Sequence, residues 1–115
     1  HVPDEDLPSY FSSSDIFLST SLSEGFGLSL LQAMASGCAV VASNIPTHCD
    51  FIQNGVNGLI YSSHDELINN LNILLNDEKL LSNIGINARK RSLDYSWDKI
   101  ANMTLNLYRN ILSLQ

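Results

Sequence analysis

The residues best suited to chemistry form one short stretch between two apolar runs. Glu24 is followed by Gly25 and Gly27, which flank Phe26, and an apolar pattern with helical spacing begins directly afterwards. Glycine lets a ligand come close to the main chain. The first N–H groups of a helix lack acceptors inside the helix, so they attract anions. A carboxylate beside such N–H groups accepts hydrogen bonds from hydroxyl groups, which sugars offer.

A second polar residue, Gln32, stands eight positions after Glu24. If the intervening residues are helical, the two lie about 12 Å apart, at about 1.5 Å per residue. This matches the reach from a hexose to a ribose across a diphosphate, so the spacing suits a nucleotide sugar. Spacing alone, however, favours a structural interpretation, in which the glycines form only a tight entry to a buried helix.

Composition indicates one globular domain. Of the 115 residues, 44% are hydrophobic and 16% are charged, and the net charge of −6 argues against nucleic-acid binding. No apolar stretch approaches the roughly 20 residues of a membrane-spanning helix, and no secretory signal opens the chain. Cys38 and Cys49 lack a metal-binding or redox spacing and are expected to be reduced, which favours a cytoplasmic protein.

The charges are distributed unevenly along the chain. Residues 1–78 contain acids but no Lys or Arg, and every basic residue lies at or after Lys79. A transferase stabilises a diphosphate leaving group with cations, a metal or main-chain dipoles. Around Glu24 only dipoles are available. If this site binds a nucleotide sugar, its cations must come from elsewhere, which indicates an incomplete site.

The elements that must position this stretch follow an α/β order, with a partial Rossmann-like parallel sheet, flanking helices and a long C-terminal helix. The expected strands cover residues 15–18, 39–42 and 57–61. Three strands are fewer than the five or six of a typical sheet, so we expect further strands at the amino end. The expected helices cover residues 2–11, begun by Pro3 or Asp4, residues 27–36, buried on nearly all sides, and a single turn over 49–53 after a loop at 43–48.

Three more helices are expected after the last strand. They begin near Ser62 or Ser63, at Asp77, and at Trp97. The last one, over residues 97–114, carries an apolar stripe that must pack on another surface. Its apolar positions are Ile100, Met103, Leu107, Ile111 and Leu114.

A series of short motifs runs along almost the whole chain. They are Pro3–Pro8, Ser12–Leu18, Ser21–Leu28, Ala33–Gly37, Val40–Ser43, Asn54–Tyr61 and Tyr95–Trp97. Together they resemble the second domain of retaining GT-B glycosyltransferases, in the large family-four group that includes sucrose, glycogen and capsule-sugar enzymes. The resemblance reverses the preference for the structural interpretation of the glycine stretch. It implies that residues 1–115 are a single, N-terminally incomplete domain, the C-terminal half of a GT-B fold.

The resemblance also implies a role for each residue of the glycine stretch. Glu24 would be the catalytic-site carboxylate that holds the hydroxyls of the donor sugar. Where the family has a second Glu for the ribose hydroxyls, this chain has Gln32. Glutamine offers one acceptor oxygen instead of two, so we expect weaker ribose binding, by about 1–3 kcal/mol. The implied donor-binding residues are Glu24, Gly25, Phe26, Gly27, Leu28 and Gln32.

The family reaction implied is transfer of a hexosyl group from a UDP- or GDP-sugar with retained configuration, as in polysaccharide biosynthesis, without a bound metal or another cofactor. The family's Lys and Arg for the diphosphate would lie upstream of His1. A missing N-terminal domain would be supplied in cis or by a separate chain, and these 115 residues would be inactive alone. The complete enzyme is expected to be cytoplasmic, with peripheral membrane association.

A different class of function remains open: a non-catalytic Rossmann-like interaction module whose nucleotide-sugar site has decayed. Gln32 and the absence of nearby cations favour this alternative, and the intact Glu24–Gly27 sequence opposes it.

Overall fold

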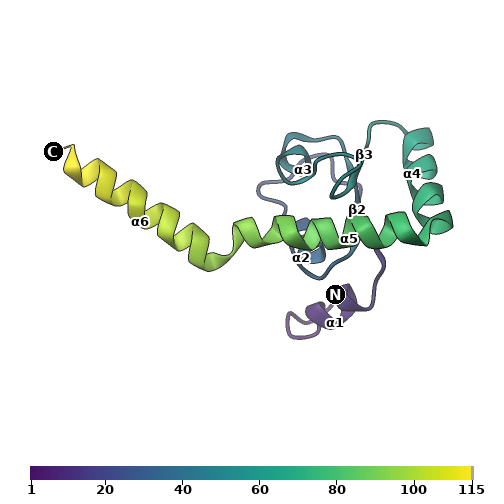
Figure 1. Ribbon diagram of the computed structural model, residues 1–115, viewed down its shortest axis with the longest axis horizontal. Helices are drawn as coiled ribbons and strands as arrows, with labels where there is room; N and C mark the ends of the chain where they lie inside the picture. Colours follow the sequence, from purple (N-terminus) through teal and green to yellow (C-terminus); the bar gives the residue numbers. More distant parts are fainter. Residues whose placement is uncertain (115) are drawn as a thin grey trace.

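A computed structural model, which describes residues 1–114, shows a sheet of three parallel strands in the order β1–β2–β3 (Figure 1). The strands are β1 (Ile16–Ser19), β2 (Ala39–Ser43) and β3 (Leu59–Tyr61). Ile16 pairs with Ala39, and Val41 pairs with Leu59. Because the strands are parallel, their carboxyl ends meet at one edge of the sheet. The predicted α/β class is confirmed.

Helices cover both faces of this sheet. The helices are α1 (Leu7–Ser12), α2 (Leu28–Ala35), α3 (Pro46–Phe51), α4 (His64–Asn76), α5 (Glu78–Ser92), the 3₁₀ turn η1 (Leu93–Tyr95) and α6 (Trp97–Ser113). Alternate residues of β2 enter two different cores. Val40 and Ala42 pack with residues of α2 and α3, whereas Ala39 and Val41 pack with Leu74 of α4 and Ile84 of α5. β2 is therefore buried on both sides.

The predicted starts of the three C-terminal helices are confirmed by side-chain caps. The Ser63 hydroxyl accepts from the Glu66 N–H at 3.2 Å, and Asp77 Oδ1 accepts from the Leu80 N–H at 2.9 Å. Ser96 caps α6 through the Lys99 N–H at 3.4 Å. Each cap satisfies an N–H that has no acceptor within its helix.

Several helix boundaries differ from those predicted, among them the end of α3, which lies at Phe51 and not at residue 53. The first helix begins at Leu7, because Asp6 donates its N–H to the Pro3 carbonyl at 3.0 Å and closes a turn before it. The segment predicted as a loop over residues 43–48 becomes helical at Pro46, which occupies the first turn of α3. Proline is favourable at that position because it lacks the N–H that a first helical residue leaves unpaired.

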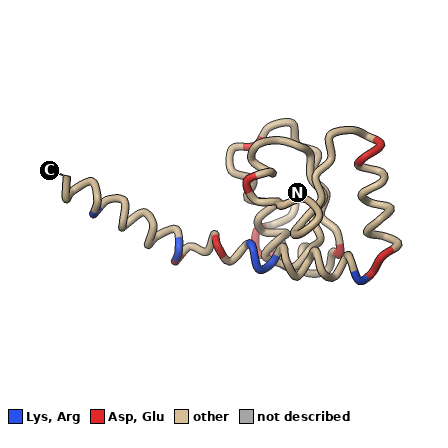
Figure 2. The backbone as a smooth tube through the Cα atoms, turned by 45° about the horizontal axis from the view of Figure 1, so that its top comes forward, with Lys and Arg blue, Asp and Glu red and all other residues tan. Residues whose placement is uncertain are grey.

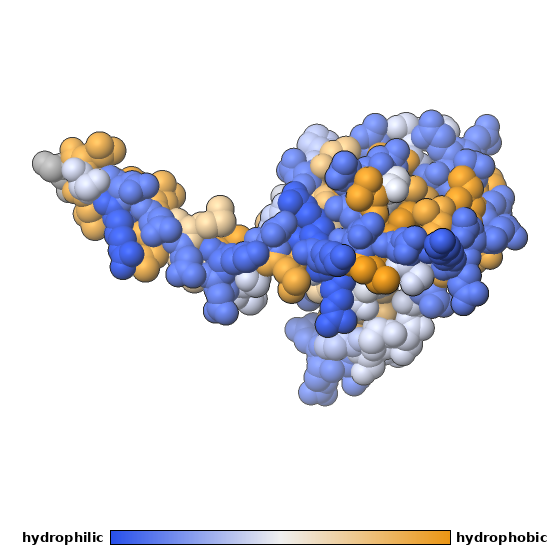
Figure 3. All heavy atoms as spheres, viewed as in Figure 1, coloured by the Kyte–Doolittle hydropathy of each residue, from blue (hydrophilic) through white to orange (hydrophobic). Residues whose placement is uncertain are grey.

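α2 is more exposed than its sequence predicted, and α6 packs little against the rest of the chain. The expectation that the helix over residues 27–36 is buried nearly all round is wrong, because α2 buries Leu30, Ala33 and Met34 but leaves Leu28 55% exposed. α6 extends away from the sheet as an arm, with Met103 64% exposed (Figures 1 and 3). Its apolar stripe therefore contacts little of this chain. None of the helices within residues 1–114 has both the length and the apolar character needed to cross a bilayer.

The two cysteines are free, as expected. Cys38 is buried, and its thiol donates to the Phe11 carbonyl at 3.1 Å. Burial, and to a lesser extent the nearby Asp15 carboxylate, raises the pKa of the Cys38 thiol. Cys38 is thus a core residue with a suppressed thiolate, and Cys49 is an exposed one.

Candidate functional site

The glycine stretch follows the carboxyl end of β1 and enters α2 through Gly27. Gly27 is the N-cap residue, with a φ of 84° in the left-handed region that glycine adopts readily. Among residues 1–114, no side chain caps the amino end of α2. The first N–H groups of this helix are therefore not occupied by a side-chain acceptor, and the helix dipole favours an anion beside them.

The Glu24 side chain lies at the surface beside this helix end. Its Oε1 accepts from the Ser21 hydroxyl at 2.8 Å, and its main-chain carbonyl accepts from the Thr47 hydroxyl at 2.9 Å. A hollow of about 370 Å³ is lined by Gly25 and Phe26 on one side and by Thr47 and other residues of α3 and η1 on the other. Glu24 is thus an accessible carboxylate on a turn that the Thr47 hydrogen bond attaches to α3.

Phe26 anchors the turn between the two glycines. Its ring meets Phe51 edge to face, with 5.4 Å between centroids, and Phe51 meets Tyr95 in the same manner at 4.8 Å. Phe26 nevertheless stays 54% exposed and lines an apolar pocket of about 440 Å³ with Leu28 and Trp97. Such edge-to-face pairs stabilise the loop beyond their buried area.

Gln32 lies in a separate hollow, a groove of about 590 Å³ between α1 and α2. Leu28 and Ser29 line the groove with Gln32 on the α2 side, and Asp4 and Leu7 lie opposite. Gln32 is exposed, and its amide is free to meet a ligand in this groove. Of the predicted residues, Gly25, Phe26, Leu28 and Gln32 line neighbouring hollows that Leu28 and Phe26 connect. Glu24 and Gly27 line none of these three hollows.

The turn depends on residues that the sequence pattern did not single out. Thr47 and His48 lie in the first turn of α3, and His48 is 1% exposed. Its ring contacts Ser43, at the end of β2, and Ser19, at the end of β1. Pro46 was the available signal for a helix here, because proline is common in a first helical turn.

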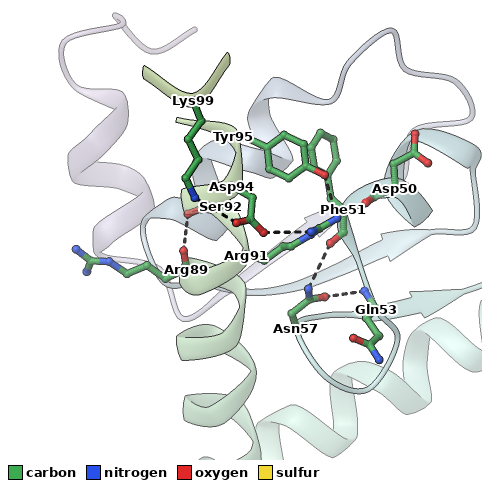
Figure 4. A network of polar contacts seen from close by, with 10 residues as sticks. All are labelled: Asp50, Phe51, Gln53, Asn57, Arg89, Arg91, Ser92, Asp94, Tyr95 and Lys99. Atoms are coloured by element: carbon green, nitrogen blue, oxygen red, sulfur yellow. Dashed lines mark hydrogen bonds and ion pairs between the residues drawn. The ribbon is translucent and has the colours of Figure 1, made fainter. Parts of the chain in front are cut away.

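The basic residues lie on α5 and α6, and Arg91 contacts Asp50 and Tyr95, which line the same hollow as Gly25 and Phe26. Figure 2 shows the Lys and Arg positions along α5 and α6. Arg91 is engaged at the carboxyl end of α3, where its guanidinium donates to the Asp50 carbonyl at 3.1 Å and the Tyr95 hydroxyl at 3.0 Å (Figure 4). It also pairs with Asp94 at 3.2 Å. Of the described residues, those lining the groove beside Gln32 include the acid Asp4 and no Lys or Arg.

Comparison with known proteins identifies the family. The sequence profile of the glycosyl transferases group 1 matches residues 1–91. The chain belongs to this family. A group 1 relative is the N,N'-diacetylbacillosaminyl-diphospho-undecaprenol alpha-1,3-N-acetylgalactosaminyltransferase of Campylobacter jejuni, which is 34% identical over 109 residues. The match covers 93% of this chain and 29% of the relative, so the chain spans less than a third of that protein's length.

Two solved structures agree with this assignment. The C-terminal domain of the group 1 family protein LpcC from Francisella tularensis superposes with a TM-score of 0.76 and 30% identity, covering 84% of this chain and 51% of that one. A TarM variant from S. aureus, solved with UDP, fondaparinux and alpha-GlcNAc-glycerol, has a TM-score of 0.81 and 31% identity, covering 90% of this chain and 22% of that one. The group 1 chain described here therefore has the fold of a GT-B C-terminal domain, as the sequence predicted.

Proposed function

We propose that this chain is the donor-binding part of a retaining glycosyltransferase that transfers a hexosyl group from a nucleotide sugar. The observation that carries the proposal is the accessible Glu24 carboxylate beside the amino end of α2, which no side chain among residues 1–114 caps. A sugar hydroxyl can donate to this carboxylate, and a diphosphate can accept from these helix N–H groups. Membership of the glycosyl transferases group 1 supports the same interpretation.

The proposed roles follow the geometry of α2. Glu24 accepts hydrogen bonds from the donor sugar and is the catalytic-site residue of the chain. The main-chain N–H groups of Gly25–Leu28 lie along the sugar and the diphosphate. Gln32, in the groove between α1 and α2, binds the ribose with one amide oxygen. The Ser21 hydroxyl donates to the Glu24 carboxylate in the free chain.

The proposed donor is a UDP- or GDP-sugar. TarM, at 31% identity, was solved with UDP, which supports a nucleoside diphosphate as the leaving group. The basic residues lie on α5 and α6, so main-chain dipoles carry the diphosphate contact in this chain (Figure 2). We infer that cations from an N-terminal GT-B domain, in cis or as a separate chain, complete the site. Residues 1–115 alone then bind the donor weakly and do not transfer sugar.

A non-catalytic interaction module is the second candidate. Gln32 in place of the family's Glu and the acid Asp4 in the same groove favour it, because both weaken contact with an anionic nucleotide. Neither feature removes the Glu24 carboxylate.

An NMR titration of the ¹⁵N-labelled chain with UDP, GDP, UDP-glucose and GDP-mannose tests the proposal. We expect amide shifts confined to residues 24–32 and the α1–α2 groove, with the sugar nucleotides moving the Glu24 turn more than the free nucleotides. Glu24→Gln should abolish that difference, and Glu66→Gln, which alters an exposed acid on α4, should not. The absence of any response at millimolar ligand would exclude donor binding by this chain and favour the interaction module.

A further inference from the structure

His48 is a buried imidazole that the proposed donor site does not use. It is 1% exposed and lies beneath the Glu24 turn, in the first turn of α3. Nδ1 lies 2.9 Å from the Ser43 carbonyl oxygen, which can only accept, so Nδ1 carries a proton. In the neutral ring, Nε2 is then an acceptor, and it lies 3.3 Å from the Ser19 hydroxyl. The two nitrogens thus contact the carboxyl ends of two neighbouring strands.

Ser43 and Ser19, the two residues that His48 contacts, both lie next to Ser21. The Ser43 hydroxyl donates to the Ser21 carbonyl at 2.5 Å, and the Ser19 and Ser21 hydroxyl oxygens lie 3.4 Å apart. The Tyr61 hydroxyl fixes the same strand end from β3, because it donates to the Ser19 carbonyl at 3.2 Å. The single Ser19 hydroxyl proton is directed to Nε2, so its contact with the Ser21 hydroxyl is not a second hydrogen bond. Ser21 is therefore attached to the residues that His48 contacts through its carbonyl, which accepts from Ser43.

Ser21 in turn contacts the carboxylate of the candidate site. Its hydroxyl donates to Glu24 Oε1 at 2.8 Å. Thr47, which precedes His48, donates to the Glu24 carbonyl at 2.9 Å. The first turn of α3 consequently reaches Glu24 by two routes, one to its main chain and one, through Ser43 and Ser21, to its carboxylate.

We propose that His48 is a positioning residue for Glu24. Its imidazole fixes Ser43, the Ser43 hydroxyl fixes the main chain of Ser21, and the Ser21 hydroxyl orients the Glu24 carboxylate. A carboxylate held in one orientation loses less conformational freedom when a ligand binds than a mobile one does. The contact between Glu24 and a sugar rests on the function proposed above, whereas the orientation of Glu24 is a property of the free chain.

Carbon-13 NMR of the ligand-free chain tests the orientation directly. His48→Phe keeps an aromatic ring and removes both nitrogens, so we expect it to move the Glu24 carboxyl resonance toward its position in Ser21→Ala. Cys49→Ser, at the exposed neighbour, should leave that resonance in place. If His48→Phe does not fold, Ser43→Ala removes the hydroxyl that donates to the Ser21 carbonyl and should cause the same displacement. An unmoved Glu24 carboxyl signal in a folded variant overturns the proposal.

Binding measurements separate positioning from general stability. We expect His48→Phe to weaken UDP-glucose binding about tenfold, the effect of one charge-assisted hydrogen bond, and UDP binding less than about twofold. His48→Asn, which retains a donor toward Ser43, should recover part of the loss. Equal weakening of both ligands would assign His48 a merely structural role and overturn the proposal. If the unaltered chain bound neither ligand, the donor function would fail, and the carboxyl signal would still decide the positioning role.

Discussion

Gly27 turns the chain from the Glu24 loop into α2 with a φ of 84°. A side chain there would meet both a strained backbone and Thr47, whose Cγ2 would lie 3.3 Å from the added Cβ. Thr47 is also the residue that donates to the Glu24 carbonyl. The conformation of this one residue therefore sets both the start of α2 and the hydrogen bond that attaches the Glu24 turn to α3.

Replacing Gly27 with alanine should destabilise the chain. We expect Gly27→Ala to lower the free energy of unfolding by about 1–2 kcal/mol, the cost of a left-handed conformation for a residue with a Cβ. Urea denaturation measures this change. Gly25→Ala is the matched control, because Gly25 has no positive φ and no atom lies within 4 Å of its added Cβ. Equal losses of unfolding free energy in the two variants would show that the left-handed conformation of Gly27 is not the cause.

Gln32 provides the second prediction at this scale. If the α1–α2 groove binds ribose, Gln32→Glu adds a second acceptor oxygen, and we expect UDP binding to tighten about fivefold. This gain lies at the low end of the about 1–3 kcal/mol expected for the ribose contact. The reason is that Asp4 lines the same groove and repels an added carboxylate. Calorimetric titration measures it. Gln53→Glu adds the same charge outside the groove, and an equal gain there would refute a specific ribose contact.

At the scale of the elements, α5 approaches the turn after α2 so closely that only glycine fits between them. Gly85 is buried, and a Cβ at this position would overlap the Gly37 carbonyl oxygen. Gly37 is itself in the left-handed region, with a φ of 83°. This contact fixes α5 across the sheet and thereby positions η1, whose Tyr95 packs against Phe51 below the Glu24 turn.

Alanine at Gly85 should destabilise the chain although it favours the helix. In an open helical position the change from glycine would stabilise by about 1 kcal/mol. Here we expect a net loss of about 1–3 kcal/mol from overpacking. Ser82→Ala, at an exposed position of the same helix, should change stability by less than about 0.5 kcal/mol. A stabilised Gly85→Ala variant in thermal or urea unfolding would show that α5 can move away from Gly37.

The elements also show which features the sequence could predict. The strands, the caps at Ser63 and Asp77 and the glycine entry to α2 follow from local patterns, because each depends on residues close together in the chain. The contacts of Thr47 and His48 do not follow from local patterns, since they form only when β1 and β2 lie side by side. Residue spacing therefore identified the candidate carboxylate but not the residues that orient it.

At the scale of the whole molecule, the structure consists of a sheet with its packed helices and a projecting arm. The molecule extends 57 × 31 × 29 Å, and α6 accounts for the long dimension (Figure 1). Apolar side chains are visible along the arm in Figure 3. The helical stripe predicted its amphipathic character, but a sequence pattern cannot name the surface that a helix covers. Leu107, in the middle of the stripe, is 56% exposed.

Removing α6 should therefore leave the rest of the fold intact. No residue of this helix is buried, so a chain that ends at Ser96 should melt within about 4 °C of the full chain, corresponding to less than about 1 kcal/mol of unfolding free energy.

The same truncation should reduce self-association at high concentration, because it removes a large exposed apolar face. Circular dichroism and sedimentation velocity measure the two effects. A full-length Leu107→Glu and Ile111→Glu variant keeps the helix but disrupts its stripe, and should match the truncation in sedimentation. A large fall in melting temperature on truncation, with no change in sedimentation, would show that α6 packs on the sheet domain in solution.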